Sequence, residues 1–237
     1  MPRLICFGDS ITQGRIGSSY VDMVRTALPG VDVVNRGIDG DTTYNLLMRL
    51  DADVIAHQPD LVSIMIGLND FGTAYGEPIS RFYYRTAKKI PVAIDIPAFE
   101  AFYTGIIQRL QHAGIAVVLF TQTTIDEIPD TPGQALLDGY VHVVHRLATK
   151  FHLPVVDVRA AFVATMRTDP RKGPKYHLLQ VARDEWNIQR GATTYAQIAH
   201  DRGFHLVVDG VHLSEAGARL VAQTVLPTLK QLLNIDG

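Results

Sequence analysis

Five short apolar runs, separated by longer stretches with helical spacing, limit what this chain can fold into. The runs are rich in Val and Ile and cover residues 4–7, 31–35, 61–66, 115–120 and 155–158. Runs this short, apolar at nearly every position, are typical of strands that are buried on both faces. Strands of this kind that alternate with helices predict a parallel sheet covered by helices on both sides.

The stretches between the runs place apolar residues three or four positions apart. This spacing predicts helices over residues 18–28, 42–57, 97–113 and 131–151, and a last helix that follows Ser214. Right-handed crossovers then restrict the topology to doubly wound arrangements. We expect a three-layer α/β/α sandwich of the flavodoxin-like kind, with five parallel strands in the order 2-1-3-4-5.

Two long connections interrupt this rhythm, near residues 71–96 and 166–207. The second contains a stretch with helical spacing at about residues 176–189. Connections of this length in a compact domain are usually functional loops or lids. Because no repeat and no low-complexity linker is visible, we expect residues 1–237 to form a single domain that carries these two insertions.

Composition argues against a nucleic-acid partner and against a membrane span. The formal net charge is −2 and the sequence pI is about 6.5, so no strong positive field would attract nucleic acid. The basic segment 167–175 is interrupted by an aspartate and two prolines and is interpreted as a solvated loop. No run approaches the roughly 20 apolar residues that span a bilayer, and no signal peptide is visible, which predicts a cytoplasmic protein.

Four short blocks of polar and glycine residues fall at or just after predicted strands or before the last helix. They read Gly8-Asp9-Ser10, then NRGIDGDT over residues 35–42, then Gly67-Leu68-Asn69-Asp70, and lastly Asp209-Gly210-Val211-His212. In doubly wound folds, ligands bind at the carboxyl ends of the strands, so these blocks are expected to converge. Each block alone also fits an ordinary turn or helix cap.

Together the blocks provide the groups that acyl transfer needs. A serine hydroxyl becomes a nucleophile when an adjacent base takes its proton. A carboxylate three residues before a histidine can orient the imidazole as that base. A glycine N–H and an asparagine amide can donate hydrogen bonds to a developing oxyanion.

In this order and spacing, the blocks GDSITQG, NRGIDGDT, GLND and DGVH resemble those of the SGNH (GDSL-type) hydrolase family. The resemblance implies a serine hydrolase that cleaves carboxylic esters through an acyl-enzyme on Ser10, with His212 as base and Asp209 orienting it. It implies an oxyanion hole formed by the backbone N–H groups of Ser10 and Gly40 and by the side chain of Asn69. It implies no metal and no organic cofactor, and a small-molecule ester as substrate.

Other functions stay open at this point. An acetyl-sugar deacetylase or an acyl-thioesterase would use the same residues. A metal-dependent hydrolase could use Asp9, Asp70, Asp209 and His212 as ligands, and a binding module could retain the fold without activity. Aromatic residues that flank Asn69 could form an acyl-binding wall, a surface that stacks on a sugar, or the core of the first insertion: Phe71, Tyr75, Phe82, Tyr83 and Tyr84. The sequence does not indicate an oligomeric state.

Overall fold

A computed structural model describes residues 1–129, 131–166 and 177–235. Its centre is a five-stranded sheet in the order β2-β1-β3-β4-β5, and every neighbouring pair is parallel. The strands are β1 (Arg3–Gly8), β2 (Asp32–Gly37), β3 (Leu61–Met65), β4 (Ala116–Phe120) and β5 (Val155–Val156). The predicted fold class and strand order are therefore confirmed.

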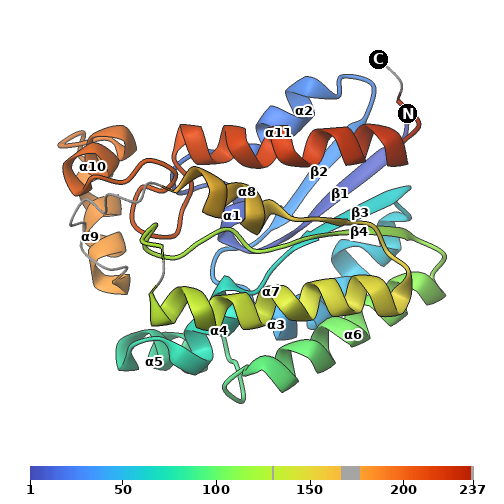
Figure 1. Ribbon diagram of the computed structural model, residues 1–237, viewed down its shortest axis with the longest axis horizontal. Helices are drawn as coiled ribbons and strands as arrows, with labels where there is room; N and C mark the ends of the chain where they lie inside the picture. The colour runs from blue at the N-terminus through green and yellow to red at the C-terminus, as the bar shows by residue number, and fades with distance from the viewer. Residues whose placement is uncertain (130, 167–176, 236–237) are drawn as a thin grey trace.

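Helices cover both faces of the sheet, as the apolar strands require (Figure 1). One face packs against α2 (Tyr20–Ala27), α8 (Val158–Thr165) and α11 (Glu215–Leu232). The opposite face packs against α3 (Thr43–Asp53), α6 (Ile96–His112) and α7 (Pro132–Phe151). The apolar clusters on the two faces leave the inner strand β1 with almost no exposure from Leu4 to Phe7.

The register of the strands brings their carboxyl ends level with one another. Gly8 at the end of β1 pairs with Gly37 of β2 on one side and with Met65 of β3 on the other. Met65 in turn pairs with Phe120 at the end of β4. The loops that follow these four strands therefore emerge along one edge of the sheet.

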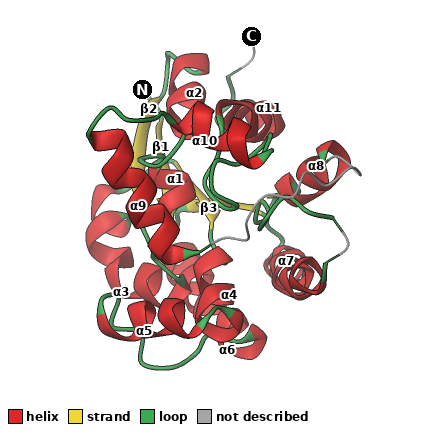
Figure 2. Cartoon of the chain, turned by 90° about the vertical axis from the view of Figure 1, so that its left-hand side faces the viewer, coloured by secondary structure: helices red, strands yellow, loops and turns green. Residues whose placement is uncertain are grey.

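The described parts of both insertions contain helices at that edge. The first contains most of α4 (Leu68–Tyr75) and all of α5 (Pro78–Thr86), and the second contains α9 (Leu178–Gln189) and α10 (Tyr195–Arg202). Figure 2 looks at this end of the molecule, with α9, α10 and α5 nearest the viewer. Short helical segments complete the described chain: α1 (Ser10–Gln13) and the 3-10 turn η1 (Ile55–His57).

The fifth apolar run differs from its prediction, because the strand ends two residues early. The side chain of Asp157 accepts a hydrogen bond from Ala160 N at 2.9 Å and caps α8, so Val158 begins a helix. The basic segment 167–175 lies outside the described residues. In the described part of the chain, no helix has the length and apolar character to cross a membrane.

Candidate active site

The candidate functional residues gather where the chain leaves β1. The next strand in the chain, β2, pairs with one side of β1, and the following strand, β3, pairs with the other side. Such a switch point is where open α/β sheets form a crevice for ligands. The loops after β1, β2 and β3 carry three of the four polar blocks, and the fourth block precedes α11.

Ser10 begins α1 directly after β1. Asp9 caps this helix, and its Oδ1 accepts a hydrogen bond from Ile11 N at 2.9 Å. Gly8 is required for the tight approach, because a Cβ there would lie 2.2 Å from Thr12 Oγ1 and 2.5 Å from Met65 O. The turn therefore holds the serine at the strand end, where its side chain borders a cavity.

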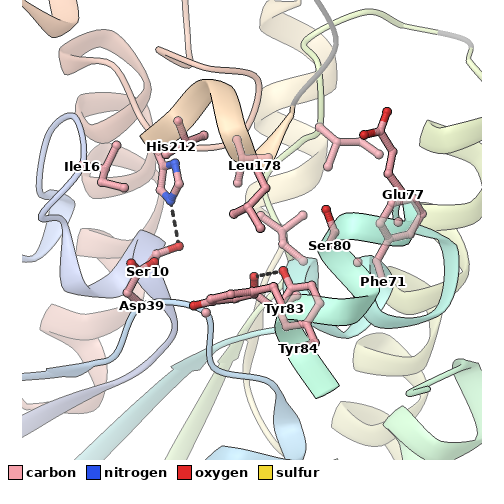
Figure 3. A pocket seen from close by; sticks show the side chains of 18 of the residues that line it. Ser10, Ile16, Asp39, Phe71, Glu77, Ser80, Tyr83, Tyr84, Leu178 and His212 are labelled. Atoms are coloured by element: carbon pink, nitrogen blue, oxygen red, sulfur yellow. Dashed lines mark hydrogen bonds between the residues drawn. The ribbon is translucent and has the colours of Figure 1, made fainter. Parts of the chain in front are cut away.

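The structure brings Ser10, His212 and Asp209 into one hydrogen-bonded series, although 202 residues separate the first pair. Ser10 Oγ lies 3.1 Å from His212 Nε2, the contact drawn as a dashed line in Figure 3. His212 Nδ1 lies 2.7 Å from Asp209 Oδ2. A base within this distance of the hydroxyl, with its other nitrogen held by a carboxylate, is the arrangement that activates a serine.

The electrostatics suit this series. Burial opposes ionisation of Asp209, but the adjacent His212 outweighs it and holds the pKa of the carboxyl below its ordinary value. Asp209 Oδ1 also accepts hydrogen bonds from the backbone N–H groups of Val211 and His212, at 3.0 and 2.9 Å. Burial likewise opposes protonation of His212, yet Asp209 raises the pKa of the imidazole above its ordinary value. An ionised aspartate therefore faces a histidine that can accept a proton.

A second carboxylate holds the loop that carries Asp209 and His212. Glu127, in the loop after β4, accepts hydrogen bonds at one oxygen from three consecutive backbone N–H groups, those of residues 205–207, at 3.0, 2.8 and 3.2 Å. Next to it, Asp126 N donates to Gly210 O at 2.6 Å. The sequence analysis did not single out Glu127, because no short motif surrounds it.

The predicted oxyanion donors also reach the site. Gly40 and Asn69 border the same cavity as Ser10 and His212. Gly40 adopts φ +71°, and a Cβ there would lie 2.7 Å from the Tyr83 hydroxyl, so both backbone and space favour glycine. One N–H of the Asn69 amide donates to Asp41 O at 2.9 Å.

Asp9 and Asp70 are buried, and burial raises the pKa of each carboxyl to about 7. Asp70 Oδ1 accepts hydrogen bonds from Thr43 N at 3.0 Å and Thr43 Oγ1 at 2.5 Å, which ties α4 to the start of α3. Both side chains thus anchor loops. In the described residues, no group of three or more His, Cys, Asp or Glu side chains is arranged to hold a metal ion.

The cavity beside Ser10 has a volume of about 670 Å³. The two insertions provide about half of its lining, and most of their side chains there are apolar or aromatic: Phe71, Tyr75, Tyr83, Tyr84, Leu178, Leu179 and Val181. Figure 3 shows Tyr83, Tyr84 and Leu178 around the space next to Ser10 and His212. Phe82, from the same predicted aromatic group, is instead 63% exposed.

Two ion pairs of Arg15 connect α9, at one side of the cavity, to the loop after β2. Arg15 contacts Glu185 of α9 at 2.6 Å and Asp39 of the loop after β2 at 3.2 Å. Tyr195 of α10 also donates its hydroxyl proton to Glu185. The second insertion is therefore tied to the loops that follow β1 and β2.

Comparison with known proteins agrees with this geometry. The sequence model of the GDSL-like lipase/acylhydrolase family matches residues 6–220. The chain belongs to this family. Membership confirms the family resemblance of the four blocks and makes the chain a hydrolase of carboxylic esters.

Similar proteins are esterases. An acetylxylan esterase of Geobacillus stearothermophilus is 31% identical over 184 residues, which are 70% of this chain and 80% of the relative. A crystal structure of an acetylxylan esterase from that organism superposes with a TM-score of 0.67 at 25% identity, over 99% of this chain and 95% of the other. Another acetyl xylan esterase structure matches 96% of this chain and 99% of the other, with a TM-score of 0.68 and 24% identity, and supports the fold.

Proposed function

We propose that Ser10 is the nucleophile of this ester hydrolase, that His212 is its general base and that Asp209 orients His212. The observation that carries the proposal is the series from Ser10 Oγ through the imidazole to the carboxylate, with contacts of 3.1 and 2.7 Å. Solved structures of catalytic mutants of the Geobacillus esterase support it, because a serine, an aspartate and a histidine are replaced there.

The reaction follows from the positions of these groups. Ser10 Oγ attacks the ester carbonyl carbon while His212 Nε2 takes the hydroxyl proton, and Asp209 stabilises the imidazolium that forms. The negative charge on the carbonyl oxygen is stabilised by the N–H groups of Ser10 and Gly40 and by the amide of Asn69. His212 then protonates the leaving alcohol, and a water molecule activated by the same imidazole hydrolyses the acyl-enzyme.

The substrate class we propose is a small carboxylic ester. A cavity of about 670 Å³ with a mainly apolar wall is within the range of small-molecule sites. It can take the acyl group and the alcohol of one ester together. An acyl thioester would react by the same steps and stays an alternative.

An acetylated sugar is a second candidate, favoured by a specific observation. Aromatic side chains line the cavity near Asn69, among them Tyr83 and Tyr84, whose ring centroids lie 5.3 Å apart. Aromatic faces of this kind suit a sugar ring, and the relative with 31% identity is an acetylxylan esterase.

The test is a series of p-nitrophenyl esters, from acetate to decanoate, together with acetylated xylose and methyl xyloside controls. Wild type and Ser10→Ala would be compared with and without EDTA. We expect turnover by wild type that EDTA leaves unchanged, and a loss of about 10⁶-fold in kcat for Ser10→Ala. A Ser18→Ala variant is the matched control, since Ser18 lies outside the cavity.

Full activity of Ser10→Ala would contradict the serine mechanism, and loss of activity with EDTA would favour a metal-dependent hydrolase. A preference for acetylated xylose over p-nitrophenyl acetate would select the sugar ester. A cytoplasmic location, the lack of a nucleic-acid partner and the single-domain organisation with two insertions stay predictions.

A further inference from the structure

The side chain of Asn69 is held at both ends of its amide. Its Nδ2 donates to Asp41 O at 2.9 Å, and its Oδ1 accepts a hydrogen bond from the Tyr84 hydroxyl at 2.6 Å. Because the Asp41 carbonyl can only accept, the nitrogen must face it, and the oxygen must face Tyr84. The orientation of the amide is therefore determined by its neighbours.

Tyr84 comes from α5, in the first insertion, and is buried at 7% exposure. Gly72 of α4 leaves room for its approach to Asn69, since a Cβ at Gly72 would lie 3.0 Å from the Tyr84 hydroxyl oxygen. The backbone carbonyl of Tyr84 also accepts a hydrogen bond from Ile90 N at 3.0 Å. The ring and its backbone are thus both held in place.

The chain just after α5 also holds the loop that contains Gly40, the second proposed oxyanion donor. Lys88 Nζ donates to Asp39 O at 2.8 Å and forms an ion pair with Asp41 at 2.6 Å. Arg49 contacts the second oxygen of Asp41 at 2.7 Å, and both Lys88 and Arg49 are largely buried. The loop that contains Gly40 is therefore fixed by charged groups, while Asn69 is fixed by this loop and by Tyr84.

We propose that Tyr84 is a positioning residue for catalysis, which orients and polarises the Asn69 amide so that its second N–H serves the oxyanion. The proposal rests on the function of Asn69 proposed above. An O–H donor on the amide oxygen draws electron density away from the nitrogen and makes its N–H groups better donors. The second N–H makes a longer hydrogen bond, from Nδ2 to Asp9 Oδ2 at 3.3 Å, and in the transition state the oxyanion would replace Asp9 as its acceptor.

The effect belongs to the transition state. The oxyanion carries its charge only after the serine has attacked, so a weaker donor lowers kcat and leaves KM nearly unchanged. Tyr84→Phe keeps the ring and removes the hydroxyl alone. We expect kcat for p-nitrophenyl acetate to fall roughly 2- to 12-fold, the range for losing one hydrogen bond.

Tyr140→Phe is the matched control. Tyr140 is fully buried, and its hydroxyl donates to Ile94 O at 2.8 Å, a bond of the same kind that touches no group of the site. Both variants lose a buried hydrogen bond, so thermal unfolding measures the shared structural cost. Only Tyr84→Phe should lower kcat.

A double-mutant cycle with Asn69→Ala tests whether Tyr84 acts through Asn69. Asn69→Ala alone should lower kcat by about 10²- to 10³-fold. In that background Tyr84→Phe should change kcat by less than about twofold, because the group that it positions is gone. Equal factors in both backgrounds, or a Tyr84→Phe variant with the kcat of wild type, would overturn the proposal. If Asn69→Ala itself retains kcat, the oxyanion function of Asn69 is what fails.

Discussion

Substitution of Asp209 by Asn tests whether Asp209 sets the tautomer of His212. The carboxylate makes one bond to His212 Nδ1 through Oδ2, and two bonds to backbone N–H groups through Oδ1. An asparagine has only one oxygen. Keeping it toward the two backbone donors costs less, so the new NH₂ group would face His212 Nδ1.

This outcome reverses the tautomer of the imidazole. Nδ1 must then accept, the proton moves to Nε2, and Nε2 can no longer take the proton of Ser10, which lies 3.1 Å away. We expect kcat to fall by about 10³- to 10⁴-fold, in line with the same change in other serine hydrolases. Since Asp209 raises the pKa of His212, its loss should also shift the acid limb of kcat/KM to lower pH.

The assay is hydrolysis of p-nitrophenyl acetate over a range of pH, with thermal unfolding as a check on folding. Asp201→Asn provides the control, because Asp201 also neighbours a histidine, His200, yet its side chain is 62% exposed and lies outside the cavity. A kcat for Asp209→Asn within about threefold of wild type would refute the tautomer argument.

Three further predictions follow from the same contacts. In wild type, kcat/KM should fall as pH drops through the pKa of His212, with a midpoint above the ordinary value of 6.5, and a midpoint below it would contradict the influence of Asp209. Glu127→Gln should lower kcat, and it should lower the free energy of unfolding by about 1–3 kcal/mol, because Glu127 accepts hydrogen bonds from three backbone N–H groups of the loop before Asp209. Glu215 is exposed, and Glu215→Gln should change neither quantity. The pKa of Asp70 is about 7 in the folded protein against an ordinary 3.8, so between these values the unfolded chain binds fewer protons and stability falls as pH rises. Asp70→Asn should therefore flatten the dependence of unfolding temperature on pH across this range, and an unchanged slope would assign it to other groups.

Much of the site could be predicted because its chemistry lies in short, contiguous motifs. Each motif alone fits an ordinary turn or helix cap. Ser10, Asp209 and His212 were singled out because all four blocks occur in the order and spacing that resemble one family. The strand order was accessible for a related reason: short apolar runs that alternate with helices leave few right-handed arrangements.

Other parts of the site carry no local signal. Glu127 acts on the site only through contacts that the fold creates, across 78 residues or more. The sequence placed Tyr84 in an aromatic group near Asn69, but the hydrogen bond of its hydroxyl to the Asn69 amide, across 15 residues, is visible only in the fold. The helix α8 was missed because Val158 continues an apolar run, while the capping contact of Asp157 ends the strand. His200 and His205 are close to Asp209 in sequence, yet neither lines the cavity.

The central claim is that Ser10 is activated by His212. Labelling with a fluorophosphonate probe, which reacts with activated serines, tests it most directly when the modified peptide is identified by mass spectrometry. We predict one label, on Ser10 of the wild type, no label on Ser10→Ala, and strongly slowed labelling of His212→Ala. A label on a different serine, or undiminished labelling of His212→Ala, would contradict the mechanism.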